Sequence, residues 1–419
     1  MKAALSGLGK VQPWLVALPI AAGMFIIWQL LRVESMRPIL ATCPPQHNYD
    51  YAFSDAHATN WTFDVARDGR NLGLTDDHCD AAFPDLYQEI DRAKTWHKAN
   101  KPRGVITEED INQYDDRAQL RVMIYEGQAM YRAIAAMPNP HLLPNIEFTI
   151  DTHDDGRDGG PRGTIWTYCR HSDARGEANW VMPDFGFWSF PTDTVGSYNE
   201  FRSKVKLTEE EGDYSSKIDR IFWRGQEGNG GEVRRMLIQA AEDKPWSDVQ
   251  WLTWGAEGSI AQMHDHCRYK YTAHTEGVTW SGRLRYLQNC NNVVITHKLD
   301  YFAHYYPLIV TSGPNQNIVE VERDYSDLQE KMESLINNPE MAQQIAARSV
   351  DVFRDRYLTP AAEACYWRRM FRTWKEIQGF EPRIWTDGRP GEEGPRRWRG
   401  VSWEQYSVTG KDWGTNAPA

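Results

Sequence analysis

Two stretches of the sequence place glycine and arginine where a phosphate could bind. The first, Thr279-Trp280-Ser281-Gly282-Arg283, follows a β-like segment and opens a helical one. Ser281 is a residue type that caps helices, Gly282 allows a ligand close to the backbone, and Arg283 can bind two phosphate oxygens. The start of a helix also carries partial positive charge. The segment therefore predicts an anion site, although an ordinary capped helix with a surface arginine has the same pattern.

The second stretch ends a β-like segment in Arg224-Gly225 and continues through a glycine-rich loop into a helix. Such a loop can cradle a diphosphate, and it can equally be a plain connection. It lacks the Gly-Lys-Ser/Thr of a Walker loop, and its glycine spacing is not that of a dinucleotide fingerprint. Glu276-Gly277 forms the turn that leads toward Arg283, so we include both residues in the candidate site.

A third group of residues could accept a proton. Asp154 lies in a turn-forming run directly after the β-like segment Ile146–Ile150. A carboxylate at the end of a strand, partly desolvated in a cleft, can act as a general base. Aspartates in turns also bond to their own backbone, which is the simpler interpretation. Asp151, Asp155 and Asp158 stay open as alternatives to Asp154.

The sequence offers little to hold a metal ion. It contains no Asp-x-Asp, Cys-x-x-Cys, His-Glu-x-x-His or EF-hand pattern. His264-Asp265-His266 is rich in ligands, but consecutive residues of a helix or strand cannot all face one ion. No Gly-x-Ser-x-Gly elbow is present either. We therefore expect no metal and no bound cofactor.

Length and charge restrict the class of protein. The 419 residues suffice for two to three domains, and the net charge of −11 argues against a nucleic-acid binder. Six cysteines are too few for a disulfide scaffold. Cys267 and Cys290 flank the Arg283 segment and are either a disulfide or two buried thiols. Cys365 is expected to pair with Cys43 or Cys79.

The N-terminal region predicts a membrane anchor. Residues 11–31 carry no charged side chain and would form about 30 Å of helix, one hydrocarbon thickness. We predict a cytosolic head over 1–10, a single signal-anchor over 11–31 and a stem over 32–78, with a cleaved signal peptide as the alternative. The sequon Asn60-Trp61-Thr62 is consistent with a luminal catalytic part.

From about residue 206 onward, β-like and helical segments alternate, which predicts parallel sheets covered by helices, an α/β fold. The expected strands are 221–224, 249–254, 269–273, 293–296 and 318–322, and the expected helices are 231–241, 282–290 and two or three within 325–377. Before residue 206 we expect helices over 83–99 and 115–137 and strands over 146–150, 164–168 and 180–182.

Five motifs in the same order make the sequence resemble the capsule-associated-protein and Rumi type of glycosyltransferases, glycosyltransferase family 90. They are Phe222-Trp223-Arg224-Gly225, His266-Cys267-Arg268-Tyr269-Lys270-Tyr271, Glu276-Gly277-Val278-Thr279-Trp280-Ser281-Gly282-Arg283, Tyr305-Tyr306-Pro307 and Cys365-Tyr366-Trp367. The resemblance covers about residues 80 to 377. It implies a GT-B fold of two Rossmann-like lobes facing a cleft, with an acceptor lobe over 79–205, a UDP-sugar donor lobe over 206–378 and a tail over 379–419.

The resemblance also implies roles for single residues. Arg283 corresponds to the arginine that meets the UDP diphosphate, with Ser281 and Gly282 at its helix start. Arg224-Gly225 corresponds to the arginine-glycine of the donor loop. Asp154 corresponds to the strand-end base. Cys267–Cys290 corresponds to a disulfide of the family, whereas Gly282 replaces an aromatic residue of the Rumi branch.

The expected function is inverting, metal-independent transfer of xylose or glucose from a UDP-sugar to a hydroxyl of a glycan or protein. A chain end without a Lys-Asp-Glu-Leu type signal favours the Golgi over the endoplasmic reticulum. Two alternatives stay open: a membrane-anchored glycoside hydrolase, which needs two carboxyls flanking the bond, and an inactive family member that binds glycans.

Overall fold

The computed structural model of the protein describes residues 61–111, 120–152, 164–228, 230–253, 260–386, 397–398 and 400–409. The predicted head and membrane span, Asn60, and the candidate base Asp154 with Asp155 and Asp158 lie outside these residues. Of the helices in the described ranges, none combines the length and the apolar character that a membrane span requires.

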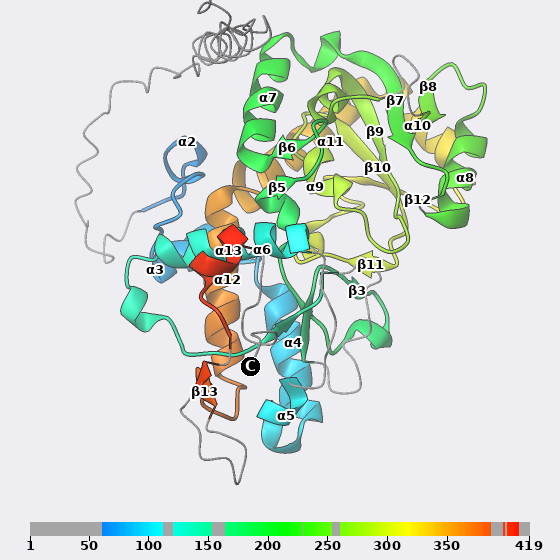
Figure 1. The fold of residues 1–419 in the computed structure, drawn as a ribbon. Coiled ribbons are helices and arrows are strands. Elements are labelled where there is room, and N and C mark those ends of the chain that lie inside the picture. Colours follow the sequence, from blue (N-terminus) through cyan, green and yellow to red (C-terminus); the bar gives the residue numbers. More distant parts are fainter. Residues whose placement is uncertain are drawn as a thin grey trace, which may run out of the picture. The chain divides into compact units, whose positions relative to one another are not determined.

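A five-stranded sheet forms the second half of the described chain, with the strand order β12-β10-β9-β7-β8. Every neighbouring pair in it is parallel, as the alternation of strands and helices predicts. Its strands are β7 (Ile218–Gly225), β8 (Ser247–Trp251), β9 (Tyr269–His274), β10 (Val293–His297) and β12 (Val319–Val321) (Figure 1). The expected α/β fold with parallel sheets is therefore confirmed.

Successive side chains of a strand point to opposite faces of a sheet. In this sheet both faces carry apolar side chains, and helices cover both faces. Val293 and Ile295 belong to one buried apolar cluster, and Val294 between them belongs to another. The first cluster is completed by α8 (Gly231–Ala241), α10 (Leu328–Asn337) and α11 (Pro339–Ser349). The second includes α9 (Arg283–Leu287) and α7 (Tyr198–Glu210), which contact each other through Tyr286 and Phe201.

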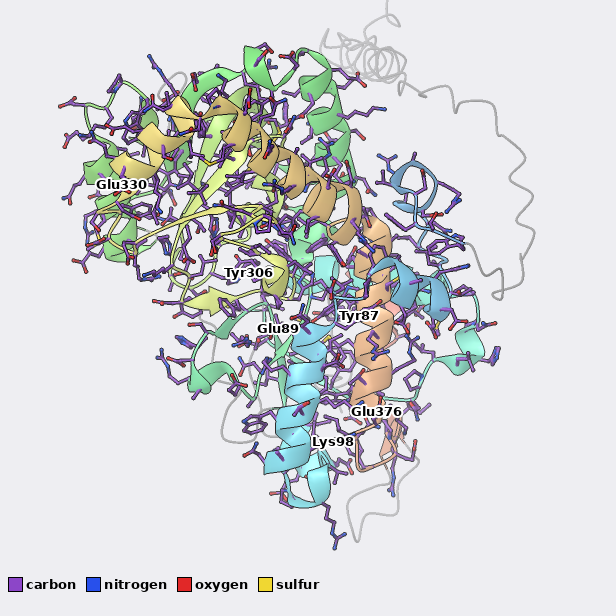
Figure 2. The ribbon with its side chains drawn as sticks, turned by 180° about the vertical axis from the view of Figure 1, so that it is seen from behind. Tyr87, Glu89, Lys98, Tyr306, Glu330 and Glu376 are labelled. Carbon is purple, nitrogen blue, oxygen red and sulfur yellow. A yellow bond between two sulfur atoms is a disulfide. The ribbon has the colours of Figure 1, made fainter. Side chains whose placement is uncertain are left out.

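The first half of the described chain is built on a smaller parallel sheet, of strand order β1-β2-β4. Its elements are β1 (Thr149–Ile150), β2 (Ile165–Thr167), β4 (Trp180–Val181), α4 (Gln88–Asn100) and α6 (Leu120–Ala135). Helix α12 (Pro360–Lys375) returns from the far end of the chain and packs beside α4 and α6 (Figure 2). Trp166 of β2 is fully buried, stacked on Phe148 at 3.8 Å and edge-on to Trp374 at 5.4 Å.

Shorter elements complete the architecture. They are α2 (Val65–Asp68), α3 (Asp76–Ala82), α5 (Glu108–Ile111), α13 (Trp403–Thr409), β3 (Arg170–His171), β5 (Ser189–Phe190), β6 (Gly196–Ser197), β11 (Tyr301–Phe302), β13 (Trp385–Thr386), β14 (Arg397–Trp398) and a π-helix (Val350–Tyr357). The antiparallel pair of β3 and β11 links the two halves, since β11 follows β10 of the large sheet. Leu74, in the region we predict as stem, is buried in the core of the first half.

Two disulfides are present among the described cysteines. Cys79–Cys365 ties α3 to α12 across a sequence separation of 286, and Cys267–Cys290 brackets β9 and α9. The second pairing confirms the one that the family resemblance implies. The first decides between the two partners expected for Cys365, in favour of Cys79.

Removing the Cys79–Cys365 disulfide by Cys79→Ser with Cys365→Ser is expected to lower the free energy of unfolding by about 2–5 kcal/mol. The pair closes a much longer loop than Cys267–Cys290, and the entropy that a cross-link removes from the unfolded chain grows with loop length. Denaturant unfolding of both serine double variants measures this. An equal or larger loss for the Cys267–Cys290 variant would contradict the expected order.

Candidate functional site

The carboxyl ends of β7 and β9 lie side by side in the large sheet, and a helix begins beyond each of them. In parallel α/β sheets this edge is where ligands bind, because loops and helix starts converge there. Helix α8 supplies Arg234 in its first turn, and α9 begins with Arg283. Both guanidinium groups lie over the indole ring of Trp223, at 6.0 and 5.9 Å from its centroid.

Arg283 is held by the backbone of the neighbouring strand. Its Nη1 donates a hydrogen bond to the carbonyl oxygen of Arg224 at 2.6 Å, and its side chain is half-buried. Burial, and next the positive charge of Arg234, lower the pKa of Arg283 to about 10. The group is therefore charged at neutral pH.

Arg234 is fixed by carbonyl groups of both loops. Its Nε donates to the carbonyl of Glu276 at 3.2 Å, and its Nη1 donates to that of Gln226 at 3.3 Å. Gly230 has φ of +122°, and a Cβ atom there would lie 2.5 Å from Arg234 Nε and 3.0 Å from the Glu276 carbonyl oxygen. A side chain at position 230 would thus displace the guanidinium, which explains the glycine.

Neither arginine has a carboxylate partner within ion-pair distance among the residues that the structure describes. Two cations that lie close to one aromatic ring repel each other, and burial makes each of them more costly without a counter-ion. An anion bound between them removes both penalties. Arg234 and Arg283 therefore suit a phosphate or diphosphate, and we call them the arginine pair.

The Arg224 side chain has a carboxylate partner that the sequence analysis does not anticipate. Its guanidinium pairs with Asp248 of β8, with Nη2 to Oδ1 at 2.6 Å, and lies over the Phe222 ring. Because neighbouring residues of a strand face opposite ways, this side chain points away from the face that carries Trp223. Its contribution to the site is the backbone carbonyl that holds Arg283. A Cβ atom at Gly225 would lie 2.4 Å from the Trp223 ring, so this glycine makes room for the indole.

The start of α9 also differs from the expectation. The N-cap is Gly282 and not Ser281, and no side chain caps the helix. Ser281 and Gly282 are both half-buried beside the arginine pair, and a Cβ atom at Gly282 would approach the Trp280 ring to 3.2 Å. The expected capping role of Ser281 is therefore wrong.

A buried ion pair fixes α9 against the first half of the chain. Arg285 of α9 is fully buried and pairs with Asp184, which also accepts the backbone N–H of Gly186 at 2.9 Å. Tyr286 Oη donates to the Gly186 carbonyl at 3.2 Å. Arg283 is therefore presented from a short helix whose inner face is bound to the opposite half of the molecule.

Of the four candidate bases, only Asp151 belongs to the described residues. It follows β1 directly, is buried, and its backbone N–H donates to the Trp166 carbonyl at 2.8 Å. The end of β1 is thus fixed to β2, and the chain leaves it toward Asp154, which lies outside the described residues. The described residues include no group of three or more His, Cys, Asp or Glu that could hold a metal ion.

Three residues of this region are missed by the sequence analysis: Arg234, Trp223 and Arg323. Arg234 carries the same signal as Arg283, an arginine in the first turn of a helix that follows a strand and a glycine loop. Trp223 adjoins the motif residue Arg224, and strand alternation places it on the face of the arginine pair. No local pattern marks Arg323, which reaches Glu276 from the far end of β12.

Acid is expected to destabilise the fold through three buried histidines. Burial lowers the pKa of His266 and His304 to about 3 and that of His297 to about 4. The unfolded chain, with a pKa near 6.5 for each, binds more protons below that pH, so stability falls as the pH drops from about 6.5 toward 4. Each histidine contributes up to about 1.4 kcal/mol per pH unit. Denaturant unfolding between pH 7 and 4.5 measures the slope, and a flat profile would contradict this prediction.

These features define an α/β protein with a candidate anion site at the carboxyl edge of a parallel sheet. The family model described as "Glycosyl transferase family 90" matches residues 111–389, more than half of the chain. The chain therefore belongs to glycosyl transferase family 90, and the resemblance that its motifs indicate is confirmed.

Curated proteins that this chain resembles are named as sugar transferases. O-glucosyltransferase rumi of Drosophila pseudoobscura pseudoobscura is 23% identical over 276 residues, which cover 58% of this chain and 64% of the relative. Protein O-glucosyltransferase 3 of Homo sapiens is 26% identical over 264 residues, covering 58% of this chain and 49% of the relative. The chain thus matches from about half to just under two thirds of the length of these relatives.

Proposed function

We propose that this protein transfers a sugar from a UDP-sugar to a hydroxyl group of a glycan or protein, with inversion at the anomeric carbon and without a metal ion. The arginine pair is the observation that carries this proposal, because two half-buried guanidinium groups that no described carboxylate pairs with suit a nucleotide diphosphate. Family membership supports sugar transfer. The names of the relatives specify glucosyl transfer, so glucose precedes xylose as the donor sugar.

The same proposal assigns a GT-B arrangement, with an acceptor lobe over 79–205 and a donor lobe over 206–378. Each half has its own parallel sheet, of three strands in the first and five in the second. Helix α12 crosses back from the second half to pack on the first. The arginine pair lies at the sheet edge of the second half, where a donor lobe would hold its nucleotide.

The transfer step uses a carboxylate and the arginine pair. The acceptor oxygen attacks the anomeric carbon from the side opposite to UDP, and its proton passes to the carboxylate of Asp154. The bond between the anomeric carbon and the phosphate oxygen breaks, and its electron pair leaves with UDP. Arg234 and Arg283 stabilise the charge that develops on the departing diphosphate, which is the task of a preorganised electrostatic site.

We further propose that the catalytic part lies in the lumen of the secretory pathway, in the Golgi, anchored by residues 11–31. The two disulfides support an oxidising compartment, because such bonds persist there and are rare in the cytosol.

The test is a panel of UDP-glucose, UDP-xylose, UDP-galactose and UDP-mannose, scored for UDP release with water and then with simple glycosides as acceptors. We expect one UDP-sugar to be cleaved at a rate that EDTA leaves unchanged. Loss of turnover with EDTA would refute the metal-free mechanism. Cleavage of a free glycoside without any nucleotide sugar would identify a glycoside hydrolase. A calorimetric titration that detects no binding of UDP would refute the proposed donor site.

A further inference from the structure

A buried carboxylate lies directly behind the arginine pair and takes no part in the proposed transfer step. The side chain of Glu276, in the loop between β9 and α9, is only 3% exposed. Its Oε1 accepts hydrogen bonds from the backbone N–H groups of Asp300 and Tyr301, both at 2.9 Å. Its Oε2 accepts one from Arg323 Nη1 at 2.8 Å. The carboxylate is thus bound by protein donors on both oxygens.

The backbone of Glu276 is bound as well. Its N–H donates to His297 Nε2 at 3.1 Å, and its carbonyl accepts Arg234 Nε at 3.2 Å. His297 Nε2 is therefore an acceptor, so the proton is on Nδ1, which donates to the Lys298 carbonyl at 2.7 Å. Burial lowers the pKa of His297 to about 4, which keeps the ring in this neutral form.

Glu276 therefore connects two parts of the molecule that serve different substrates in the proposed reaction. On one side its carbonyl orients Arg234 of the arginine pair. On the other, its carboxylate holds the segment that leads from β10 to β11, and β11 pairs with β3 of the first half. Tyr301 of that pair also contacts the ring of His171, with centroids 4.4 Å apart.

Arg323 holds the carboxylate in this position. Besides Glu276, its guanidinium donates to the Lys298 carbonyl at 3.0 Å and pairs with Asp300 Oδ2 at 3.0 Å. Its Nη1 also lies 3.2 Å from His297 Nδ1 at the end of β10, so Arg323 contacts Glu276, the last residue of β10 and the segment between β10 and β11. The Arg323 side chain is 37% exposed, and it reaches Glu276 from the end of β12. We call Glu276, His297 and Arg323 the Glu276 cluster.

We propose that Glu276 and Arg323 are positioning residues, which set Arg234 for the diphosphate and couple donor binding to the β3–β11 pair that joins the two halves. The part of this inference that concerns donor binding rests on the proposed function. The part that concerns the hydrogen bonds of Glu276 and Arg323 does not. This inference differs from the role expected from the sequence, in which Glu276 touches the donor, because both carboxylate oxygens already have protein partners. In Glu276→Gln an amide NH₂ faces Arg323, so two donors meet and the cluster opens.

The experiment compares UDP affinity by calorimetry with amide hydrogen exchange at Tyr301 and Phe302. We expect Glu276→Gln and Arg323→Ala each to weaken UDP binding by about tenfold and to speed exchange at Tyr301. The double variant should be no worse than either single one, because both changes open one cluster. Arg323→Lys, which keeps a charge for Glu276, should recover part of the affinity. Glu322→Gln is the matched control, since Glu322 is exposed and pairs with Lys298.

Several outcomes would overturn the proposal. If Glu276→Gln weakens UDP binding while Arg323→Ala leaves both readouts at the wild-type level, Glu276 contacts the donor directly. Unchanged exchange at Tyr301 in both variants would show that the cluster does not hold the β3–β11 segment. A wild-type protein that binds no UDP refutes the proposed function instead, and the exchange measurement, made without nucleotide, still decides the structural part.

Discussion

We expect Arg283→Ala to bind UDP more weakly than the wild type and to transfer sugar about 10²–10³-fold more slowly, while remaining folded. The loss follows from removing one of two cations that meet the departing diphosphate. Folding should survive because the Arg283 guanidinium donates to a backbone carbonyl, that of Arg224, and is repelled by Arg234. In the absence of nucleotide the variant should be no less stable than the wild type.

Three single arginine variants and one double variant extend this test. Arg234→Ala should resemble Arg283→Ala, and the double variant should lose less than the sum, since both groups bind one ligand. Arg235→Ala, at the exposed neighbour on α8, should behave as the wild type. Arg224→Ala should lower stability, because it leaves Asp248 without its buried partner. Calorimetric UDP titration and thermal melting report the two effects separately, and unchanged UDP binding by Arg283→Ala would remove its proposed role.

The second large effect is expected at the proposed base. Asp154→Asn should bind UDP as tightly as the wild type but transfer sugar about 10²–10⁴-fold more slowly, because an amide cannot accept the acceptor proton. Single-turnover kinetics at saturating donor isolate this step. The corresponding variants of Asp151, Asp155 and Asp158 serve as controls. Full turnover by Asp154→Asn, with loss in one of the others, would move the base to that residue.

The large sheet is well predicted from the sequence because its signals are local. The helix expected over 231–241 coincides with α8, where glycines precede an amphipathic run. The strand expected over 146–150 shrinks to Thr149–Ile150 in β1, because its neighbour β2 spans only Ile165–Thr167 and no longer ladder can form. Periodicity indicates an extended segment, but the length of a strand depends on its partner.

In the candidate site, too, residues with a local sequence signal are predicted, and contacts between distant segments are not. Arg283 is predicted because a strand, a turn, a glycine and an arginine follow one another in the sequence. The ion pair of Arg224 is not predicted, because its motif is local while its partner, Asp248, belongs to the next strand. The alternation of strand residues could have placed Trp223 and Arg224 on opposite faces. The cluster of Glu276, His297 and Arg323 joins three strand ends, and only the fold brings these residues together.

The return of α12 has a consequence for the order in which the protein is made. Trp166 and Phe148 emerge from the ribosome long before their partners on α12, which are Trp374 for Trp166 and Phe371 for Phe148. Cys365 follows Cys79 by 286 residues, about 15–60 s of translation at the usual rates. From the synthesis of β4 until α12 emerges, the earlier sheet lacks the helix that covers its aromatic face, and such exposed apolar surface makes a chain prone to aggregate. A transcript cut short before Pro360 would leave this face permanently bare, and we expect its product to aggregate although the five strands of the large sheet are all present.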